Sequence, residues 1–377
     1  MSDPILVAGA GIGGLAAAVA LRAAGHETLL IERAPEIREL GAGITVQING
    51  MRALRRLGVA DRVASRGAVI REASIRTWDG TVLSTDPLAD LAIEYGTPCV
   101  GIHRGRLQGA LLEAATEHGL VLGKAITGVS QDSSGVTVSL DDGSTRRGSL
   151  LVGADGIRST VRAALHGRTD PDYAGYSIWR AICARPASVP ADIIRVYWGP
   201  SCRFGFVPIS ATEVYWYCTQ VEPEHGLQPD DVVASLRARH QGWDSPVTEL
   251  IAATDPAALF RTAIADRPAL PSWGLGRVTL LGDAAHPMTP NLGQGACQAL
   301  EDAVALASCL SAHGADPVAA LREYERLRMP RAHRVVEIAR DLGRRGHTPT
   351  GWQTAQSSTD RPLGDTLRRW LYDEVAA

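Results

Sequence analysis

The chain of 377 residues has few cysteines, few phenylalanines and no long apolar run. Its six cysteines show no C-x-x-C spacing, which argues against a disulfide framework and a zinc site, so no metal is expected. No segment reaches about 18 uncharged apolar residues, and we therefore expect no integral membrane segment. No basic leader precedes the first apolar stretch after Pro4. These absences favour a protein of the reducing cytoplasm.

Neither sign of charge is in large excess. The 38 basic and 41 acidic residues give a net charge of -3, and no basic tract is present, so no nucleic-acid partner is expected. The length suffices for two domains with a sizeable core. A small or apolar ligand is the favoured partner, and the sequence leaves both a monomer and a homodimer open.

The N-terminal segment has the pattern of a dinucleotide-binding unit. An apolar strand, Ile5 to Ala8, runs into G-x-G-x-x-G at 9–14 and then into an expected helix. A second strand, Thr28 to Ile31, ends at Glu32, whose carboxylate can accept both hydroxyls of an adenosine ribose. This context favours a dinucleotide over a purely structural glycine turn. It does not choose between FAD and NAD.

A second glycine-led helix follows a buried strand near residue 280. Val278 to Leu281 is unbroken apolar sequence, and Gly282-Asp283 ends it with a carboxylate that can bind a polyol. Gly293 to Ala296 then opens a helix whose bare amides favour an anionic guest, such as the edge of a reduced flavin. The alternative is an ordinary strand, turn and capped helix.

Three sites between these segments also point to a ligand. The small-residue loop 40–45 could lie along a flat ring, and Arg104 begins an expected helix, where a cation is unfavourable unless it meets a group such as a pyrophosphate. Asp155 precedes another expected helix within GADGIRSTVR at 153–162. For Asp155, an acid at a helix N-terminus is a sufficient alternative.

The glycine loop with its ribose acid, GADGIRSTVR, and GDAAHPMTPNLGQGA at 282–296 together resemble the three signatures of the class A flavoprotein monooxygenases. The resemblance implies an α/β p-hydroxybenzoate hydroxylase-like fold, with a Rossmann-like FAD-binding domain and a smaller mixed-sheet substrate domain. The FAD-binding domain is then expected at 1–71, 98–167 and 274–345, the substrate domain at 72–97 and 168–273, and a tail at 346–377. Two helices, 317–328 and 331–345, are expected before the tail.

The resemblance also implies which residues contact the cofactor. It assigns the pyrophosphate to the first glycine loop and Arg104, and the ribose to Glu32. It assigns the ribityl chain to Asp283 and the pyrimidine edge of the flavin to Gly293 to Ala296. The resemblance associates Asp155, the acid of GADGIRSTVR, with both FAD and the nicotinamide cofactor. The expected residues are Gly9, Gly11, Gly14, Glu32, Arg33, Thr45, Arg104, Ile126, Asp155, Asp283, Gly293, Gly295 and Ala296.

Strand alternation suggests the substrate side of the site. Arg203 and two phenols, Tyr215 and Tyr217, occupy the same faces of neighbouring expected strands, so they are the expected catalytic residues. Trp216 must point the other way. Pro290 is expected at the substrate pocket. For each aromatic residue, packing in the core remains the alternative.

The implied reaction uses FAD, NADPH or NADH, and molecular oxygen to hydroxylate a small aromatic or heteroaromatic substrate through a flavin C4a-hydroperoxide. A flavin halogenase is disfavoured, because Trp198 is followed by Gly199-Pro200 and no W-x-W-x-I-P element occurs. Two alternatives stay open. One is a Baeyer-Villiger or epoxidising monooxygenase of the same fold, and the other is a non-catalytic flavin-binding sensor.

Overall fold

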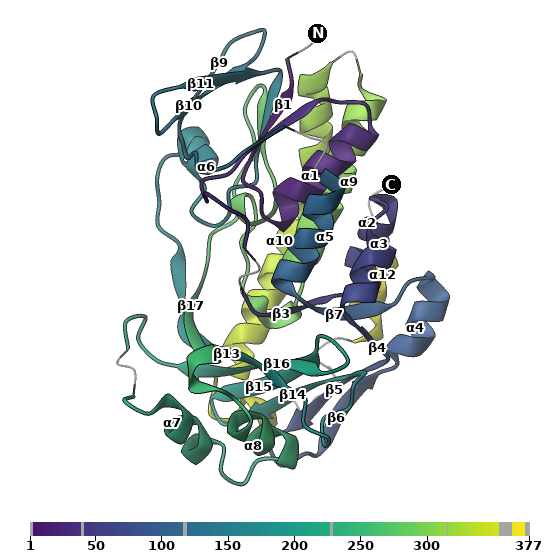
Figure 1. Cartoon of the computed structure of the whole chain (residues 1–377), viewed down its shortest axis with the longest axis vertical. Coiled ribbons are helices and arrows are strands. Elements are labelled where there is room, and N and C mark those ends of the chain that lie inside the picture. Colours follow the sequence, from purple (N-terminus) through teal and green to yellow (C-terminus); the bar gives the residue numbers. More distant parts are fainter. Residues whose placement is uncertain are drawn as a thin grey trace.

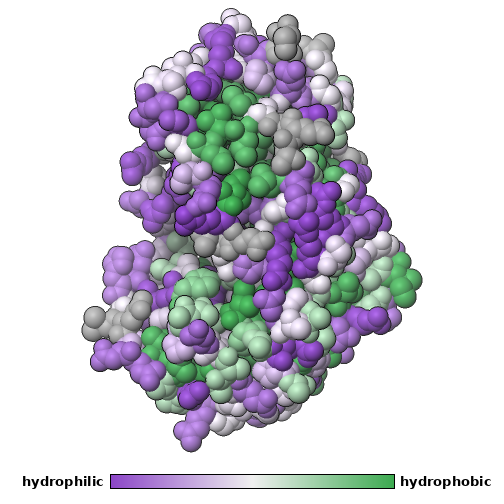
Figure 2. Space-filling model, in the orientation of Figure 1, coloured by the Kyte–Doolittle hydropathy of each residue, from purple (hydrophilic) through white to green (hydrophobic). Residues whose placement is uncertain are grey.

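The computed structural model describes residues 3–38, 41–115, 119–226, 229–314, 316–353 and 364–373. Figure 1 shows two layered parts joined by the long helix α10 and by strands that run between them. The same view in Figure 2 shows hydrophilic residues over most of this face, with hydrophobic residues gathered on its upper part. The chain has the predicted α/β fold, with a parallel sheet in one part and a separate mixed sheet in the other.

The upper part is built on a five-stranded parallel sheet. Its middle strands are buried along their whole length, as expected for apolar strands covered on both faces. Segments far apart in the sequence, near residues 5, 28, 150 and 278, meet in this one sheet. In spatial order the strands are β18 (Val278–Leu280), β12 (Leu150–Gly153), β1 (Ile5–Ala8), β2 (Thr28–Ile31) and β8 (Gly119–Val121).

Helices pack together beside this sheet. α1 contacts both α5 and α9, and α9 contacts α10, so the two glycine-led helices lie against each other. Two three-stranded sheets and several short helices complete this part. Its helices are α1 (Ile12–Ala23), α2 (Ile48–Arg56), α3 (Ala60–Arg66), α5 (Arg104–Ala115), α6 (Thr160–His166), α9 (Gly295–Ala312) and α10 (Pro317–Gly346), and its small-sheet strands are β3 (Gly43–Val46), β7 (Cys99–His103), β4 (Ala68–Ile70), β11 (Thr145–Gly148), β10 (Val136–Leu140) and β9 (Ile126–Gln131).

A seven-stranded mixed sheet forms the lower part. Its strands come from the ranges 72–97 and 168–273 that the resemblance assigned to a substrate domain; the domain boundaries themselves stay predictions. Helices α7 (Val232–Arg239) and α8 (Ser245–Ala252) lie at the lower end of Figure 1, against one face of the sheet. In order the strands are β17 (Phe260–Asp266), β13 (Asp172–Ala184), β16 (Glu213–Val221), β15 (Cys202–Pro208), β14 (Ile193–Gly199), β5 (Glu72–Thr77) and β6 (Val82–Asp86).

One helix differs from the prediction. The two helices expected over 317–345 are a single helix, α10, which continues through Pro330. Proline removes one backbone donor, but the residues on either side are fixed by side-chain bonds, because Arg328 and Arg331 both bind carboxylates of α9. The helix therefore continues past the proline. The described residues also form α4 (Leu88–Tyr95) and α12 (Asp365–Asp373), with short 3-10 turns at Pro256–Ala258, Gly282–Ala284 and Pro290–Leu292.

All six cysteines are buried and carry free thiols. Within the described residues, no three His, Cys, Asp or Glu side chains are grouped so as to hold a metal ion. No described helix combines the length and apolar character needed to cross a membrane.

Candidate functional site

The first glycine loop has the geometry of a phosphate cradle. Gly9 has φ of +95°, and a Cβ there would lie 2.6 Å from the carbonyl oxygen of Ala154. A Cβ on Gly14 would lie 1.9 Å from the Gly9 carbonyl oxygen, so strand and helix approach too closely for any side chain. Gly11 instead has no heavy atom within 4 Å of such a Cβ. The outer glycines thus permit the turn and the packing, and the middle one leaves open space for a dinucleotide phosphate.

Glu32 lies at the end of β2, beside this loop. Its carboxylate accepts hydrogen bonds from the backbone N–H groups of Ala10 and Ala34, both at 2.8 Å. These bonds fix the carboxylate and leave further lone pairs for ribose hydroxyls. The Glu32 carbonyl accepts from Lys124 N–H, which brings the half-buried Ile126 to the same edge. The neighbouring side chain, Arg33, is exposed.

Asp283 and Arg104 approach each other from different elements. Neighbouring protein atoms desolvate the Asp283 carboxyl and raise its pKa, while His286 and Arg104 nearby oppose that rise. The Asp283 side chain is nevertheless exposed, so its carboxylate can accept hydrogen bonds from a ligand. Arg104 begins α5, and its guanidinium has no hydrogen-bond partner among the described residues. Both groups are therefore available to a ligand.

The second glycine-led helix begins beside Asp283. A Cβ on Gly295 would lie 4.0 Å from Asp283 Oδ1, and Gly295 is the first residue of α9. Gly293 is exposed in the left-handed region at φ of +63°, and Ala296 is half-buried. The unpaired amides of the first turn of α9 thus share a region with the carboxylate. The two expected contacts, to a ribityl chain and to a pyrimidine edge, lie side by side.

Polar side chains that sequence reasoning missed hold this turn in place. Gln47 donates from Nε2 to the carbonyl of Leu292 at 2.7 Å, and Gln294 donates from Nε2 to Gln47 Oε1 at 2.8 Å. Asn49 donates to Gln294 Oε1 at 2.9 Å. α2 begins at Ile48, and Asn49, its second residue, is fully buried. Thr45 lies just before, on β3, paired with Gly101.

The Asp155 side chain is hydrogen-bonded to the start of α6, the helix that follows it. Its carboxylate accepts from the Ser159 hydroxyl and from the backbone N–H groups of Thr160 and Val161, at 2.5, 2.7 and 3.2 Å. Burial raises its pKa and these hydrogen bonds oppose the rise. Arg162, further along the same signature, donates to the carbonyls of Ala284 and Ala285. This geometry favours the helix-capping alternative for Asp155, and its role toward FAD and nicotinamide stays a prediction.

The alternation predicted for the substrate strands is confirmed. Gly205 pairs with Tyr217 and Val207 with Tyr215, which places both phenols and Arg203 on one face. A Cβ on Gly205 would lie 2.6 Å from the Tyr217 hydroxyl, so the Tyr217 ring covers Gly205, which shares a strand face with Arg203. Trp216 lies on the opposite face, where its indole N–H donates to Thr254 at 2.8 Å.

Arg203 is buried and already has protein partners. It donates to Asn291 Oδ1 at 3.1 Å and to the carbonyl of Leu342, and its guanidinium stacks over Trp198 at 4.1 Å. Asn291 in turn donates to the Tyr176 hydroxyl at 2.8 Å. Arg203 therefore joins the mixed sheet to the turn that leads into α9. Pro290, the neighbour of Asn291, is exposed at that turn.

The two phenols differ in their surroundings. Burial raises the pKa of Tyr217 to about 12, with Arg203 opposing the rise, and its hydroxyl has no hydrogen-bond partner among the described residues. Tyr215 packs between two sheets, since a Cβ on Gly43 would lie 2.3 Å from Tyr215 Cβ. Arg180, on β13, faces Tyr217 across the sheet and was missed by sequence reasoning. The geometry therefore favours Tyr217 as a ligand contact and packing for Tyr215.

Residues 3–339 match the family described as FAD binding domain. The chain belongs to this family. It is 44% identical to the Aurachin C monooxygenase/isomerase of Stigmatella aurantiaca over 351 residues, which cover 93% of this chain and 90% of that protein. It is 37% identical to the FAD-dependent urate hydroxylase of Klebsiella pneumoniae over 339 residues, which cover 89% and 88%.

Solved structures of known proteins are also similar to this chain. The crystal structure of Klebsiella pneumoniae HpxO complexed with FAD and uric acid is similar at a TM-score of 0.85 and 34% identity, over 99% of this chain and 93% of that one. A salicylate hydroxylase substrate complex, at a TM-score of 0.80 and 23% identity over 99% and 96%, shares the fold. The flavoprotein resemblance is confirmed, and the chain is an FAD-dependent enzyme of the monooxygenase kind.

Replacing Asp283 by alanine should weaken FAD binding about tenfold or more, because one charge-assisted hydrogen bond to the cofactor is worth about 1.5–3 kcal/mol. Titration of the apoprotein with FAD, followed by flavin fluorescence, measures this. Asp283→Asn serves as the control, since it keeps an acceptor oxygen and should lose less affinity. Equal FAD affinity in wild type and Asp283→Ala would show that the carboxylate does not contact the cofactor.

Proposed function

We propose that the protein hydroxylates a small aromatic or heteroaromatic compound, with NADPH or NADH as reductant and molecular oxygen as co-substrate. The observation that carries the proposal is the position of Arg203. It faces the same side of the mixed sheet as Tyr217 and bonds to Asn291, which precedes the exposed Gly293 by two residues. A substrate on this face would therefore lie next to the turn Pro290–Leu292, which leads into α9 and the expected flavin contacts.

FAD, when bound, supplies the redox and oxygen chemistry. Gly11 would leave room for its pyrophosphate, and Glu32, Arg104 and Asp283 would hold its polar groups. Arg203 and Arg180 would provide positive charge for a substrate oxygen and favour its anion, which makes an aromatic ring more nucleophilic. Tyr217 remains protonated at neutral pH, since burial raises its pKa to about 12, so its hydroxyl can donate to the same oxygen.

The choice of substrate class draws on the relatives. Their names include 3-amino-4-hydroxybenzoate 2-monooxygenase, 6-hydroxynicotinate 3-monooxygenase and FAD-dependent urate hydroxylase. All three substrates are small rings with an oxygen substituent that can carry negative charge. Such a group suits a pocket lined by arginine and tyrosine.

A second candidate is oxygen transfer followed by rearrangement of the product. The 44% identical relative is named a monooxygenase/isomerase, which pairs these two activities in one protein. The alternative of epoxidation, which the sequence left open, falls within this candidate. Simple hydroxylation leaves the carbon skeleton unchanged, whereas rearrangement moves a substituent, so the product structure distinguishes the two.

The test is a panel of phenols, hydroxylated N-heteroaromatics and quinolones incubated with the FAD-loaded enzyme. NADH or NADPH oxidation, oxygen uptake and hydrogen peroxide release are measured together, and products are identified by mass spectrometry and NMR. A true substrate should stimulate NAD(P)H oxidation and yield a product with one added oxygen atom. Bound FAD without stimulated turnover by any compound would favour the flavin-sensor alternative. A cytoplasmic location and a monomeric or dimeric state stay predictions.

A further inference from the structure

A cavity of about 420 Å³ lies in the lower part of the molecule, and none of the residues expected to contact FAD lines it. It lies on the face of the mixed sheet that α7 and α8 cover, because Cys202 and Gln220 share their strand faces with Phe204 and Trp216. Arg203, the neighbour of Cys202, points to the opposite face. The volume falls in the usual range for small-molecule sites, about 300–1,000 Å³. The cavity is therefore separate from the face that carries Arg203 and Tyr217, although the same strands, β15 and β16, form both faces.

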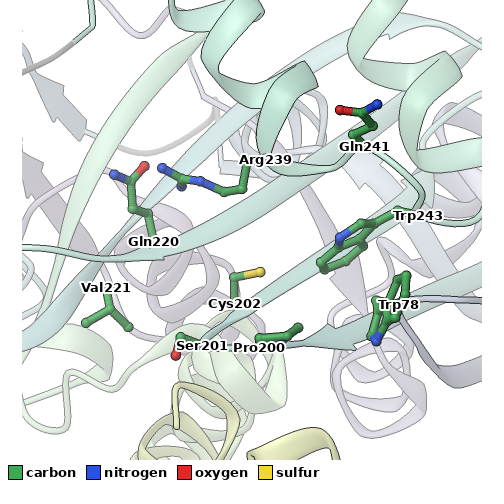
Figure 3. A pocket seen from close by; sticks show the side chains of 9 residues that line it. All are labelled: Trp78, Pro200, Ser201, Cys202, Gln220, Val221, Arg239, Gln241 and Trp243. Atoms are coloured by element: carbon green, nitrogen blue, oxygen red, sulfur yellow. The ribbon is translucent and has the colours of Figure 1, made fainter. Parts of the chain in front are cut away.

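One side of the cavity is positively charged. Arg239, at the end of α7, has no hydrogen-bond or ion-pair partner among the described residues. Gln220 and Gln241 flank it with side-chain amides, and no acidic residue of the described chain lines the space. The nearby carboxylate of Glu222 is paired with Arg261 at 2.6 Å and does not neutralise Arg239. Figure 3 shows Arg239 and Gln220 extending toward each other from different elements.

The other side is aromatic. Trp78 and Trp243 come from the β5–β6 turn and from the segment before α8, and Figure 3 shows both indoles beside Pro200 and Cys202. Trp243 packs directly on the backbone, since a Cβ on Gly199 would lie 2.4 Å from its ring. Flat indoles offer stacking surface to a flat guest.

The turn that closes the cavity is strained. Ser201 has φ of +56°, the one positive value at a non-glycine residue among those described. It follows Pro200 in a two-residue turn between Gly199 and Cys202, at the position where a type II turn usually has glycine. A non-glycine residue in this conformation is strained, and such strain clusters at ligand sites.

We propose that this cavity is a second ligand site, which binds a planar aromatic carboxylate between the two indoles and Arg239. The indoles would cover the ring faces, and the guanidinium would bind the carboxylate, with the glutamine amides as further donors. The site is independent of the flavin, and the inference does not rest on the proposed reaction.

The test uses 2-naphthoate and its uncharged analogue 2-naphthamide, titrated into the FAD-loaded protein by calorimetry. Wild type should bind 2-naphthoate at least about tenfold more tightly than 2-naphthamide, because the carboxylate gains charge-assisted hydrogen bonds. Arg239→Gln should weaken 2-naphthoate binding about tenfold or more and leave 2-naphthamide binding unchanged. Trp78→Leu should weaken both ligands. Trp243 is kept, because it supports the backbone at Gly199.

Arg237→Gln is the matched control. Arg237 lies on the same helix, is exposed and does not line the cavity, so its replacement removes the same charge from the same surface. It should leave 2-naphthoate binding unchanged. The proposal is overturned if 2-naphthoate does not bind, if Arg239→Gln binds it as wild type does, or if the two arginine variants lose affinity equally. If 2-naphthoate binds with an affinity that does not depend on Arg239, it binds at the proposed substrate face of the mixed sheet or at another surface.

Discussion

Replacing Arg328 by methionine is expected to lower the free energy of unfolding by about 3–5 kcal/mol, because it leaves buried carboxylates without their counter-charge. Arg328 is fully buried between α10 and α9. It donates to Glu301 at 2.6 Å, to Asp302 at 2.7 Å and to Gln298 Oε1 at 2.8 Å. Denaturation in urea, followed by circular dichroism on the FAD-free protein, measures the loss.

The control for this prediction is Arg326→Met, two residues away on the same helix. Arg326 is exposed and pairs with Glu323 at 2.7 Å, so its removal should cost less than about 1 kcal/mol. A similar small loss for Arg328→Met would mean that water or the remaining Arg331 compensates the two carboxylates, and the expected role of Arg328 would be wrong.

The same network predicts a loss of stability in acid. Burial by itself would raise the pKa of Asp302, but His286 and Arg328 outweigh burial and lower the pKa from its ordinary value of 3.8 to about 2. A lowered folded-state pKa means that the contribution of Asp302 to stability is complete above about pH 4 and is lost as pH falls toward about 2. Urea unfolding of wild type over this range should show the decline, and Arg328→Met should show a shallower one. An equal decline in both proteins would assign the acid sensitivity to other carboxylates.

The network also shows where sequence reasoning reaches its limit. Glycine spacing and apolar runs predict local elements, because a tight turn or a buried strand restricts the residues at each position. The phosphate loop, the β2 acid and the strand before Asp283 were therefore predictable. Glu301 and Arg328, by contrast, are 27 positions apart and meet only because α9 and α10 pack together.

The contacts among the expected substrate residues were even less predictable from the sequence. Alternation in the sequence places Arg203 and Tyr217 on one face, but it contains no information about which strand lies beside which. The pairing of β13 with β16 brings Arg180 to Tyr217, and a bond across the two parts of the molecule ties Arg203 to Asn291. The packing of Tyr215 beneath Gly43 depends on a contact between two sheets. Such contacts between distant segments are set by tertiary packing, which no local pattern records.

Tyr217→Phe is expected to lower product formation by roughly tenfold to a thousandfold while FAD binding and slow NAD(P)H oxidation persist, as loss of a group that assists proton transfer would do. The change removes one hydroxyl group that has no partner among the described residues, so it should not disturb the fold. Oxygen consumed without product should appear as hydrogen peroxide. Arg203→Met should have the same effect, because it removes the positive charge beside the substrate oxygen.

Arg203 also supports the turn before α9, so its variant needs a separate check on structure. Wild-type FAD affinity and an unchanged melting temperature in Tyr217→Phe would exclude a folding defect in that variant, which makes it the sharper of the two tests. Tyr215→Phe is the matched control, since the geometry assigns Tyr215 to packing and its loss of a hydroxyl should change coupling much less. If Tyr217→Phe and Arg203→Met both couple NAD(P)H oxidation to product as wild type does, the substrate lies elsewhere. If Tyr215→Phe alone uncouples the reaction, the original expectation for Tyr215 holds, and Tyr215 rather than Tyr217 assists the proton transfer.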